Sequence, residues 1–116
     1  MKFLLLLILL LSNDVALGCA GLTAAQLKDR LQKETVTQLV FFASWCASCK
    51  KHLKPESAST SLFIAVFDEQ PAAQKAYTAF MGTEHQARCV WDQDGSIAAH
   101  YRIKRLPVVR PLQGGK

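Results

Sequence analysis

The sequence VTQLVFFASWCASCK, residues 36–50, joins an apolar run to a pair of cysteines and decides how the rest of the chain is interpreted. Residues 36–43 are dense in β-branched, aromatic and aliphatic side chains, and the run is long enough for a strand buried on both faces. From Cys46 the pattern becomes helical through Leu53, and Pro55 removes a backbone donor and should end that helix. The strand is therefore expected to deliver Cys46 to the N-terminus of a helix.

Cys46 and Cys49 are the candidate reactive residues. Two thiols three positions apart on the first turn of a helix can close a small disulfide ring and reopen it by exchange. Cys46 lies nearer the helix end, so we interpret it as the exposed nucleophile and Cys49 as the thiol that resolves the mixed disulfide. The helix dipole favours the thiolate of Cys46, and Lys50, Lys51 and His52 add positive potential nearby.

Metal binding was the first alternative for this pair. A zinc knuckle needs a second pair of ligands, and Cys19 and Cys89 do not supply one at suitable spacing. The three histidines are scattered at His52, His85 and His100. The sequence therefore predicts no metal site, and redox chemistry is the preferred interpretation.

Further elements alternate around the cysteine pair. Thr23 and Gln26 have the spacing of a capping box, which predicts a helix from Thr23 to about Glu34, with Leu22 and Leu27 placed as a hydrophobic staple. The remaining predictions are a strand over 62–67, a helix over 71–81 that ends before Gly82, and a strand over 88–91. This order, α-β-α-β-α-β, predicts an α/β fold with a mostly parallel central sheet flanked by helices.

The beginning of the chain has the pattern of an export signal. Lys2 supplies the charged region, residues 3–11 are uninterrupted apolar side chains, and Ala16-Leu17-Gly18 provides small residues for cleavage. The apolar run is too short to span a bilayer. We predict a signal peptide over 1–18 and a mature domain over 19–116. Because Cys19 follows this site as in a bacterial lipobox, its lipidation and anchoring to a membrane are preferred slightly over ordinary cleavage.

Basic residues gather near the end of the chain. The whole sequence has a formal net charge of +5, and removing residues 1–18 takes away one lysine and one aspartate, so the charge does not change. A solvated tail is the simplest interpretation, and an acidic partner or an anionic membrane surface is the alternative. Nucleic-acid binding is not expected, because Tyr101 is the only aromatic residue among these cations. The cations are Arg102, Lys104, Arg105, Arg110 and Lys116.

Two stretches resemble the thioredoxin superfamily. Residues 39–50 resemble its active-site strand and helix start, including Trp45 before the first cysteine. Residues 91–109, WDQDGSIAAHYRIKRLPVV, resemble the TlpA/ResA-like branch, in which D-x-D-G is followed by Y-x-V and a proline. Pro107 matches the cis-proline of that family, although trans prolines are far commoner in general. The resemblance implies a thioredoxin-like fold in which the backbone of Leu106 pairs with an incoming substrate strand.

Three departures from the family pattern bear on mechanism. Val40 stands where many thioredoxins have a buried aspartate that takes the proton of the resolving cysteine. His52 stands where ResA-like proteins have a glutamate, and it is either an acid–base group or a solvated histidine. Residues 108–116 are too few for the C-terminal hairpin and last helix of the family, so both are expected to be missing, which would expose a sheet edge and favour a partner.

The fate of Cys89 is open from spacing alone. A buried thiol is the default expectation; a disulfide with an unlipidated Cys19 and a bond between chains are the alternatives.

The resemblance implies an exported protein-disulfide oxidoreductase. We expect a periplasmic or otherwise extracytoplasmic reductase without a cofactor, fed by a membrane electron donor and acting on apocytochrome or other cysteine-containing exported proteins. Ala47 and Ser48 match neither strongly reducing nor strongly oxidising relatives, so the redox direction is open. The alternatives are a copper chaperone that uses the two cysteines with His52 or His100, and a redox-inactive structural subunit of an envelope complex.

Overall fold

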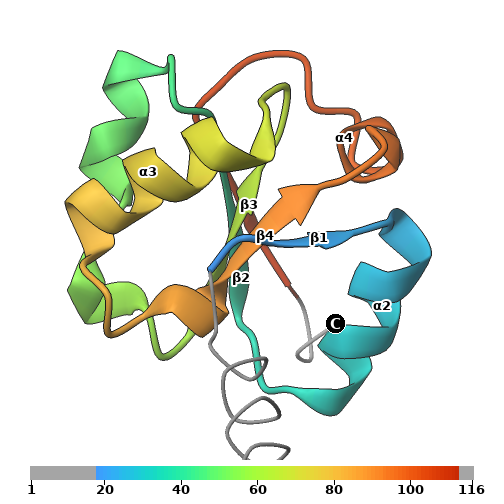
Figure 1. Ribbon diagram of the computed structural model, residues 1–116. Helices are drawn as coiled ribbons and strands as arrows, with labels where there is room; N and C mark the ends of the chain where they lie inside the picture. The colour runs from blue at the N-terminus through green and yellow to red at the C-terminus, as the bar shows by residue number, and fades with distance from the viewer. Residues whose placement is uncertain (1–17, 113–116) are drawn as a thin grey trace, which may run out of the picture.

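A mixed five-stranded sheet forms the centre of the protein (Figure 1). The computed structural model describes residues 18–112. The strands lie in the order β1-β4-β3-β2-β5, and the pairs β1–β4, β4–β3 and β3–β2 are parallel whereas β5 is antiparallel to β2. Their bounds are β1 (Ala20–Leu22), β2 (Gln38–Phe42), β3 (Ser61–Ala65), β4 (Cys89–Asp92) and β5 (Val108–Pro111).

Helices cover both faces of this sheet, as Figure 1 shows. The helices α2 (Ala24–Lys33) and α4 (Ser96–His100) cover one face, and α3 (Gln70–Met81) and the short 3-10 helix η1 (Ala47–His52) cover the other. Two further 3-10 turns, η2 (Pro55–Ser57) and η3 (Gln86–Arg88), lie in the connections. The fold is therefore α/β, with the sheet buried between two helical layers.

The residues of β2 show how both faces become apolar. Successive side chains of a strand point to opposite faces, so Leu39 and Phe41 join the core under α2 and α4 while Val40 and Phe42 join the core under α3 and η1. All four are 2% exposed or less. Such a strand needs apolar residues at every position, which is the pattern that predicted a strand buried on both faces.

Most of the predicted helix boundaries are confirmed. The Thr23 side chain accepts a hydrogen bond from the Gln26 backbone, and the Gln26 side chain accepts one from the Thr23 backbone, so the capping box of α2 is present. Helix α3 has a proline in its first turn and ends at Gly82, whose φ of 76° lies in the left-handed region that favours glycine.

Other expectations were wrong. The predicted α-helix from Cys46 to Leu53 is the six-residue 3-10 helix η1, closed by bonds such as that from the Cys49 N–H to the Cys46 carbonyl. Phe67, predicted inside a strand, lies beyond the end of β3 with a φ of 56°. The order α-β-α-β-α-β lacks β1, α4 and β5, three short elements whose hydrogen bonds or packing depend on distant parts of the chain.

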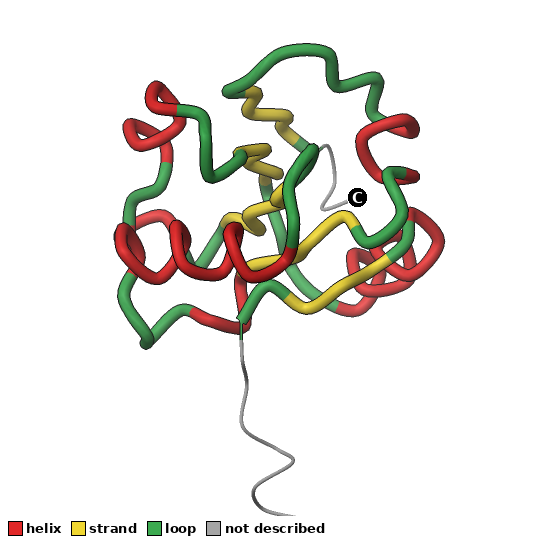
Figure 2. The backbone as a smooth tube through the Cα atoms, turned by 45° about the horizontal axis from the view of Figure 1, so that its top comes forward, coloured by secondary structure: helices red, strands yellow, loops and turns green. Residues whose placement is uncertain are grey.

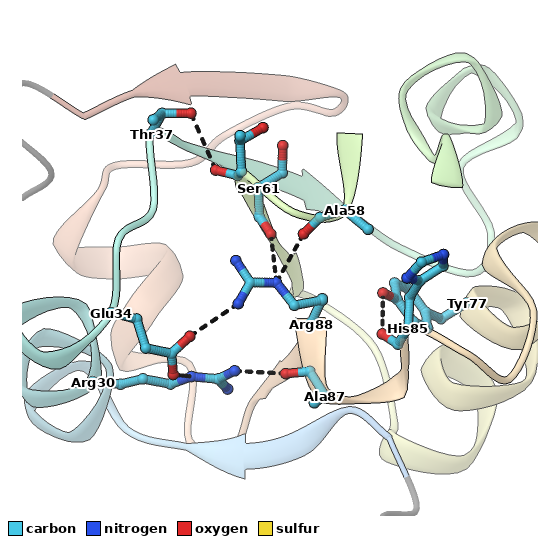
Figure 3. A network of polar contacts seen from close by, with 10 residues as sticks. Arg30, Glu34, Thr37, Ala58, Ser61, Tyr77, His85, Ala87 and Arg88 are labelled. Carbon is cyan, nitrogen blue, oxygen red and sulfur yellow. Dashed lines mark hydrogen bonds and ion pairs between the residues drawn. The ribbon is translucent and has the colours of Figure 1, made fainter. Parts of the chain in front are cut away.

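A network of charged side chains ties α2 to the start of β4 (Figure 3). The Glu34 carboxylate accepts from the guanidinium groups of Arg30, at 2.6 Å, and Arg88, at 2.9 Å. Arg88 Nε also donates to the carbonyls of Ala58 and Ser61, just before and within β3. The network therefore joins one helix to two neighbouring strands at the amino end of the sheet.

The sequence predicts a signal peptide at the start of the chain and an exposed sheet edge near its end. The predicted signal peptide lies outside the described residues except for Gly18. Among residues 18–112, no helix has the length and apolar character needed to cross a bilayer. Strand β5 pairs with β2 on one side, and within the described residues no strand pairs with its other edge.

Candidate functional site

Cys46 and Cys49 lie at the carboxyl end of β2. A disulfide bond joins them, Cys46 being the residue that caps η1 and Cys49 lying inside it. Cys46 is 9% exposed and Cys49 1% exposed, so Cys46 is the more exposed residue of the pair. This asymmetry matches the roles that the sequence assigned to the two residues, nucleophile and resolving thiol.

The loop before Cys46 is fastened to the loop that follows β3. The Asp68 carboxylate accepts the Ser44 backbone N–H at 2.6 Å and the Ser44 hydroxyl at 3.0 Å. Trp45 Nε1 donates to the Phe67 carbonyl at 3.0 Å, and Trp91 Nε1 donates to the Asp68 carbonyl at 2.8 Å. These bonds tie together the carboxyl ends of three parallel strands, where catalytic loops of α/β sheets lie.

Two aromatic side chains stand exposed beside the disulfide. Trp45 is 63% exposed and Phe67 is 51% exposed, although both are large and apolar. The hydrogen bond between Trp45 Nε1 and the Phe67 carbonyl keeps the two residues next to each other. Exposed aromatic neighbours of this kind are typical of surfaces that bind another chain.

The loop between α4 and β5 arches over the same end of the sheet (Figure 2). The register pairs Val108 with Phe41, which places Pro107 at the carboxyl end of β2, near Cys46. The peptide bond between Leu106 and Pro107 is cis, as the resemblance implies. Leu106 is half-buried and packs against the core cluster that includes Cys46 and Cys49.

The predicted supporting residues differ in their surroundings. The ammonium group of Lys50 lies 5.4 Å from the centre of the Phe80 ring, so its charge faces α3. His52 is exposed at the end of η1, and no side-chain hydrogen bond of His52 occurs within the described residues. Val40 is 2% exposed in the cluster that contains Cys49, so the position of the family's buried aspartate is apolar here.

Sequence reasoning missed three residues of this site. The Ser48 hydroxyl lies 3.7 Å from the Cys46 sulfur. Phe67 and Asp68 meet the cysteine loop only through tertiary structure. The available signal was that Phe67 ends and Asp68 directly follows the predicted strand over 62–67, because the carboxyl ends of parallel strands meet on one side of the sheet.

Cys19 and Cys89 form a second disulfide, which corrects the expectation of a buried Cys89 thiol. The parallel pairing of β1 with β4 brings the two residues together, since each lies at the amino end of its strand. The Cys19 sulfur cannot carry this bond and a thioether lipid at once, so the structure favours the disulfide over the lipidation that the sequence suggested. This disulfide lies at the amino ends of its two strands, whereas Cys46 follows the carboxyl end of β2.

No cluster of three or more His, Cys, Asp or Glu side chains that could hold a metal ion occurs within residues 18–112. Comparison with known proteins gives no family assignment, because no protein-family model matches the chain and no curated protein matches it significantly.

Proposed function

We propose that this protein is an exported thiol–disulfide oxidoreductase with a thioredoxin-like fold of the TlpA/ResA type, which reduces disulfides in other exported proteins. The observation that carries the proposal is the Cys46–Cys49 disulfide at the carboxyl end of β2, in which Cys46 is the more exposed residue and directly follows an exposed tryptophan. The resemblance of residues 39–50 and 91–109 to that family supports it independently of the geometry.

The proposed reaction begins with the reduced pair. The Cys46 thiolate attacks one sulfur of a substrate disulfide, which forms a mixed disulfide and releases the other substrate sulfur as a thiolate. Cys49, as thiolate, then attacks the Cys46 sulfur, closes the Cys46–Cys49 bond and releases the second substrate thiolate. Two electrons pass from the cysteine pair to the substrate, whose thiolates take up two protons. A dithiol donor, proposed to be a membrane protein, returns the oxidised pair to the reduced state by the same exchange in reverse.

The difference in exposure between the two cysteines favours attack at Cys46. Cys49 is 1% exposed and Cys46 9% exposed, so we propose that an external thiolate attacks the sulfur of Cys46 and that the mixed disulfide forms there. We propose that the backbone N–H and carbonyl groups of Leu106, next to Pro107, form hydrogen bonds with the substrate strand that carries the cysteine.

An extracytoplasmic location is part of the proposal. Disulfides that serve as permanent structural links persist mainly in oxidising compartments, and the Cys19–Cys89 bond joins β1 to β4 with both residues at most 1% exposed. The signal-like residues 1–18 point in the same direction.

A redox titration tests the proposal. The protein is equilibrated in glutathione buffers of graded ratio, quenched by alkylation and digested, and each cysteine pair is quantified by mass spectrometry. We expect one reversible two-electron transition of Cys46 and Cys49 at a reducing potential, and no such transition in Cys46→Ala. A folded protein whose Cys46–Cys49 pair shows no reversible transition would contradict the proposal.

A further inference from the structure

Three cations occupy the loop that leads from α4 to Pro107. Arg102, Lys104 and Arg105 are all exposed. The ion pairs among residues 18–112 join Arg30 and Arg88 to Glu34 and Lys33 to Asp29, so none of the three loop cations has an ion-pair partner there. Their positive charge is therefore directed to solvent at the end of the sheet that carries the cysteine pair.

This loop is continuous with the aromatic surface beside Cys46. A shallow cavity of about 350 Å³ is lined on one side by Phe67 and on the other by Arg102, Ile103 and Lys104. Phe67 and Arg102 both have a φ of 56°, a conformation that bulky residues adopt only where their surroundings impose it. A strip thus runs from Trp45 across Phe67 to Arg102 and Lys104, and Arg105 follows Lys104 in the same loop.

The acidic side chains at this edge do not cancel the loop charge at close range. The Asp68 carboxylate accepts two hydrogen bonds from Ser44 and one from the Glu69 backbone. The Asp94 carboxylate accepts two from Ser96. Glu69 is exposed, directly precedes α3, and forms no ion pair with the loop cations within residues 18–112. The carboxylates of Asp68 and Asp94 accept hydrogen bonds within the protein, whereas the loop cations make no side-chain hydrogen bond within the described residues.

We propose that this strip binds the substrate protein through an extended acidic segment with an apolar side chain next to its reactive cysteine. The apolar side chain packs on Trp45 and Phe67, and the acidic side chains lie along Arg102, Lys104 and Arg105. The inference rests on the proposed function and adds the substrate class to it. Charge complementarity of this kind raises association rates about tenfold or more, and salt removes the effect.

Peptide disulfides test the inference. Two peptides are prepared as mixed disulfides with 2-mercaptoethanol, identical except that one has aspartates and the other lysines around a Leu-Cys pair. The reduced protein is mixed with each, and second-order rate constants are measured at low and high salt, with bis(2-hydroxyethyl) disulfide as a neutral reference. We expect the acidic peptide to react at least about tenfold faster at low salt, and the difference to shrink in high salt.

Matched variants locate the effect. Lys104→Glu/Arg105→Glu is expected to abolish or reverse the preference, whereas Lys28→Glu/Lys75→Glu makes the same change in net charge on α2 and α3 and is expected to keep most of it. Phe67→Ala is expected to slow the reaction with both peptides, because the apolar side chain of each loses its contact surface.

The outcomes separate this inference from the function beneath it. Failure to react with any disulfide would overturn the proposed function. Normal reaction with the neutral disulfide, together with equal rates for the two peptides, would overturn only the acidic substrate class. If the same loop variant then lost binding to vesicles containing phosphatidylglycerol, the loop would be assigned to a lipid surface instead.

Discussion

The Ser48 hydroxyl, 3.7 Å away, is the side-chain hydrogen-bonding neighbour of the Cys46 sulfur within the described residues. When the pair is reduced, this hydroxyl can donate to the Cys46 thiolate, and a hydrogen bond to the charged form of a group lowers its pKa. We predict that Ser48→Ala raises the pKa of the Cys46 thiol in the reduced protein, because the thiolate loses this hydrogen-bond donor. The pH dependence of the alkylation rate of the reduced protein measures this pKa.

Ser59→Ala is the control for that variant, since Ser59 is exposed and lies away from the cysteine pair. An identical alkylation profile in Ser48→Ala and the wild type would contradict a role for the Ser48 hydroxyl.

The same residues show what the sequence can and cannot predict about the site. Cys46 and Cys49 were predictable because their chemistry depends on a local spacing of three positions and on the strand before them. The partner of Cys89 was not, because it depends on β1 pairing with β4 across 70 residues of sequence. Phe67 and Asp68 likewise reach the site through the packing of separate strands, which leaves no local pattern.

At the scale of elements, the Glu34 network controls how α2 is held. Burial raises the pKa of Glu34, but hydrogen bonds and charges from Arg30 and Arg88 lower it by more, so the net pKa lies below the ordinary value of 4.5. The folded pKa is thus lower than the unfolded one. The carboxylate therefore stabilises the fold above the ordinary value, and this contribution is lost as the pH falls through the lowered pKa.

We predict that Glu34→Gln lowers the free energy of unfolding by at most about 1 kcal/mol at pH 7, since the partly exposed network is screened by solvent. The difference from the wild type should shrink at a second, acidic pH, because the contribution of the Glu34 charge is lost as the pH falls through its lowered pKa. Urea unfolding at the two pH values measures it. Asp29→Asn breaks an exposed pair with Lys33 and should change little; an equal loss in both variants would rule out a special contribution of the network.

Element boundaries followed the strength of the local pattern. Helix α2 and helix α3 were predicted closely because a capping box, a proline and a glycine mark their ends. Strand β1 has three residues without a period, α4 has five and β5 contains Pro111. Such elements form because a neighbour supplies their hydrogen bonds or packing: β4 pairs with β1, β2 pairs with β5, and the buried Asp92 carboxylate accepts the first N–H groups of α4.

The disulfide between β1 and β4 stabilises the fold more than the reactive one does. A bond that closes a longer loop restricts the unfolded chain more, and the chain-entropy relation gives about 4 kcal/mol for the separation of 70 residues between Cys19 and Cys89. The same relation gives about 2 kcal/mol for the separation of 3 between Cys46 and Cys49. We therefore predict a larger loss of unfolding free energy in Cys19→Ala/Cys89→Ala than in Cys46→Ala/Cys49→Ala, measured by urea denaturation.

A peptide map without reduction accompanies that measurement. It should recover Cys19 linked to Cys89. Recovery of a lipidated Cys19 with a free Cys89 would show that processing takes the other course, and the stability difference between the two double variants would then reverse.

Across the whole molecule, the two disulfides differ in their position on the sheet and in their exposure. Cys46 follows the carboxyl end of β2, whereas Cys19 and Cys89 lie at the amino ends of β1 and β4. The two pairs also differ in access, since Cys46 is 9% exposed and Cys19 and Cys89 are at most 1% exposed. Cys19–Cys89 is therefore the less exposed of the two disulfides.

This difference in exposure predicts that the two disulfides are reduced in two separate stages. Thiolate attack needs access to a sulfur, so mild dithiothreitol should reduce Cys46–Cys49 in the native protein, and Cys19–Cys89 should be reduced only when the fold opens. Alkylation followed by mass spectrometry should find two modified cysteines under native conditions and four in denaturing urea. Modification of all four at one rate in the native protein would mean that β1 separates from β4 readily. If only two cysteines are modified, the Cys19–Cys89 bond keeps β1 and β4 joined while Cys46 and Cys49 change between the reduced and the disulfide state.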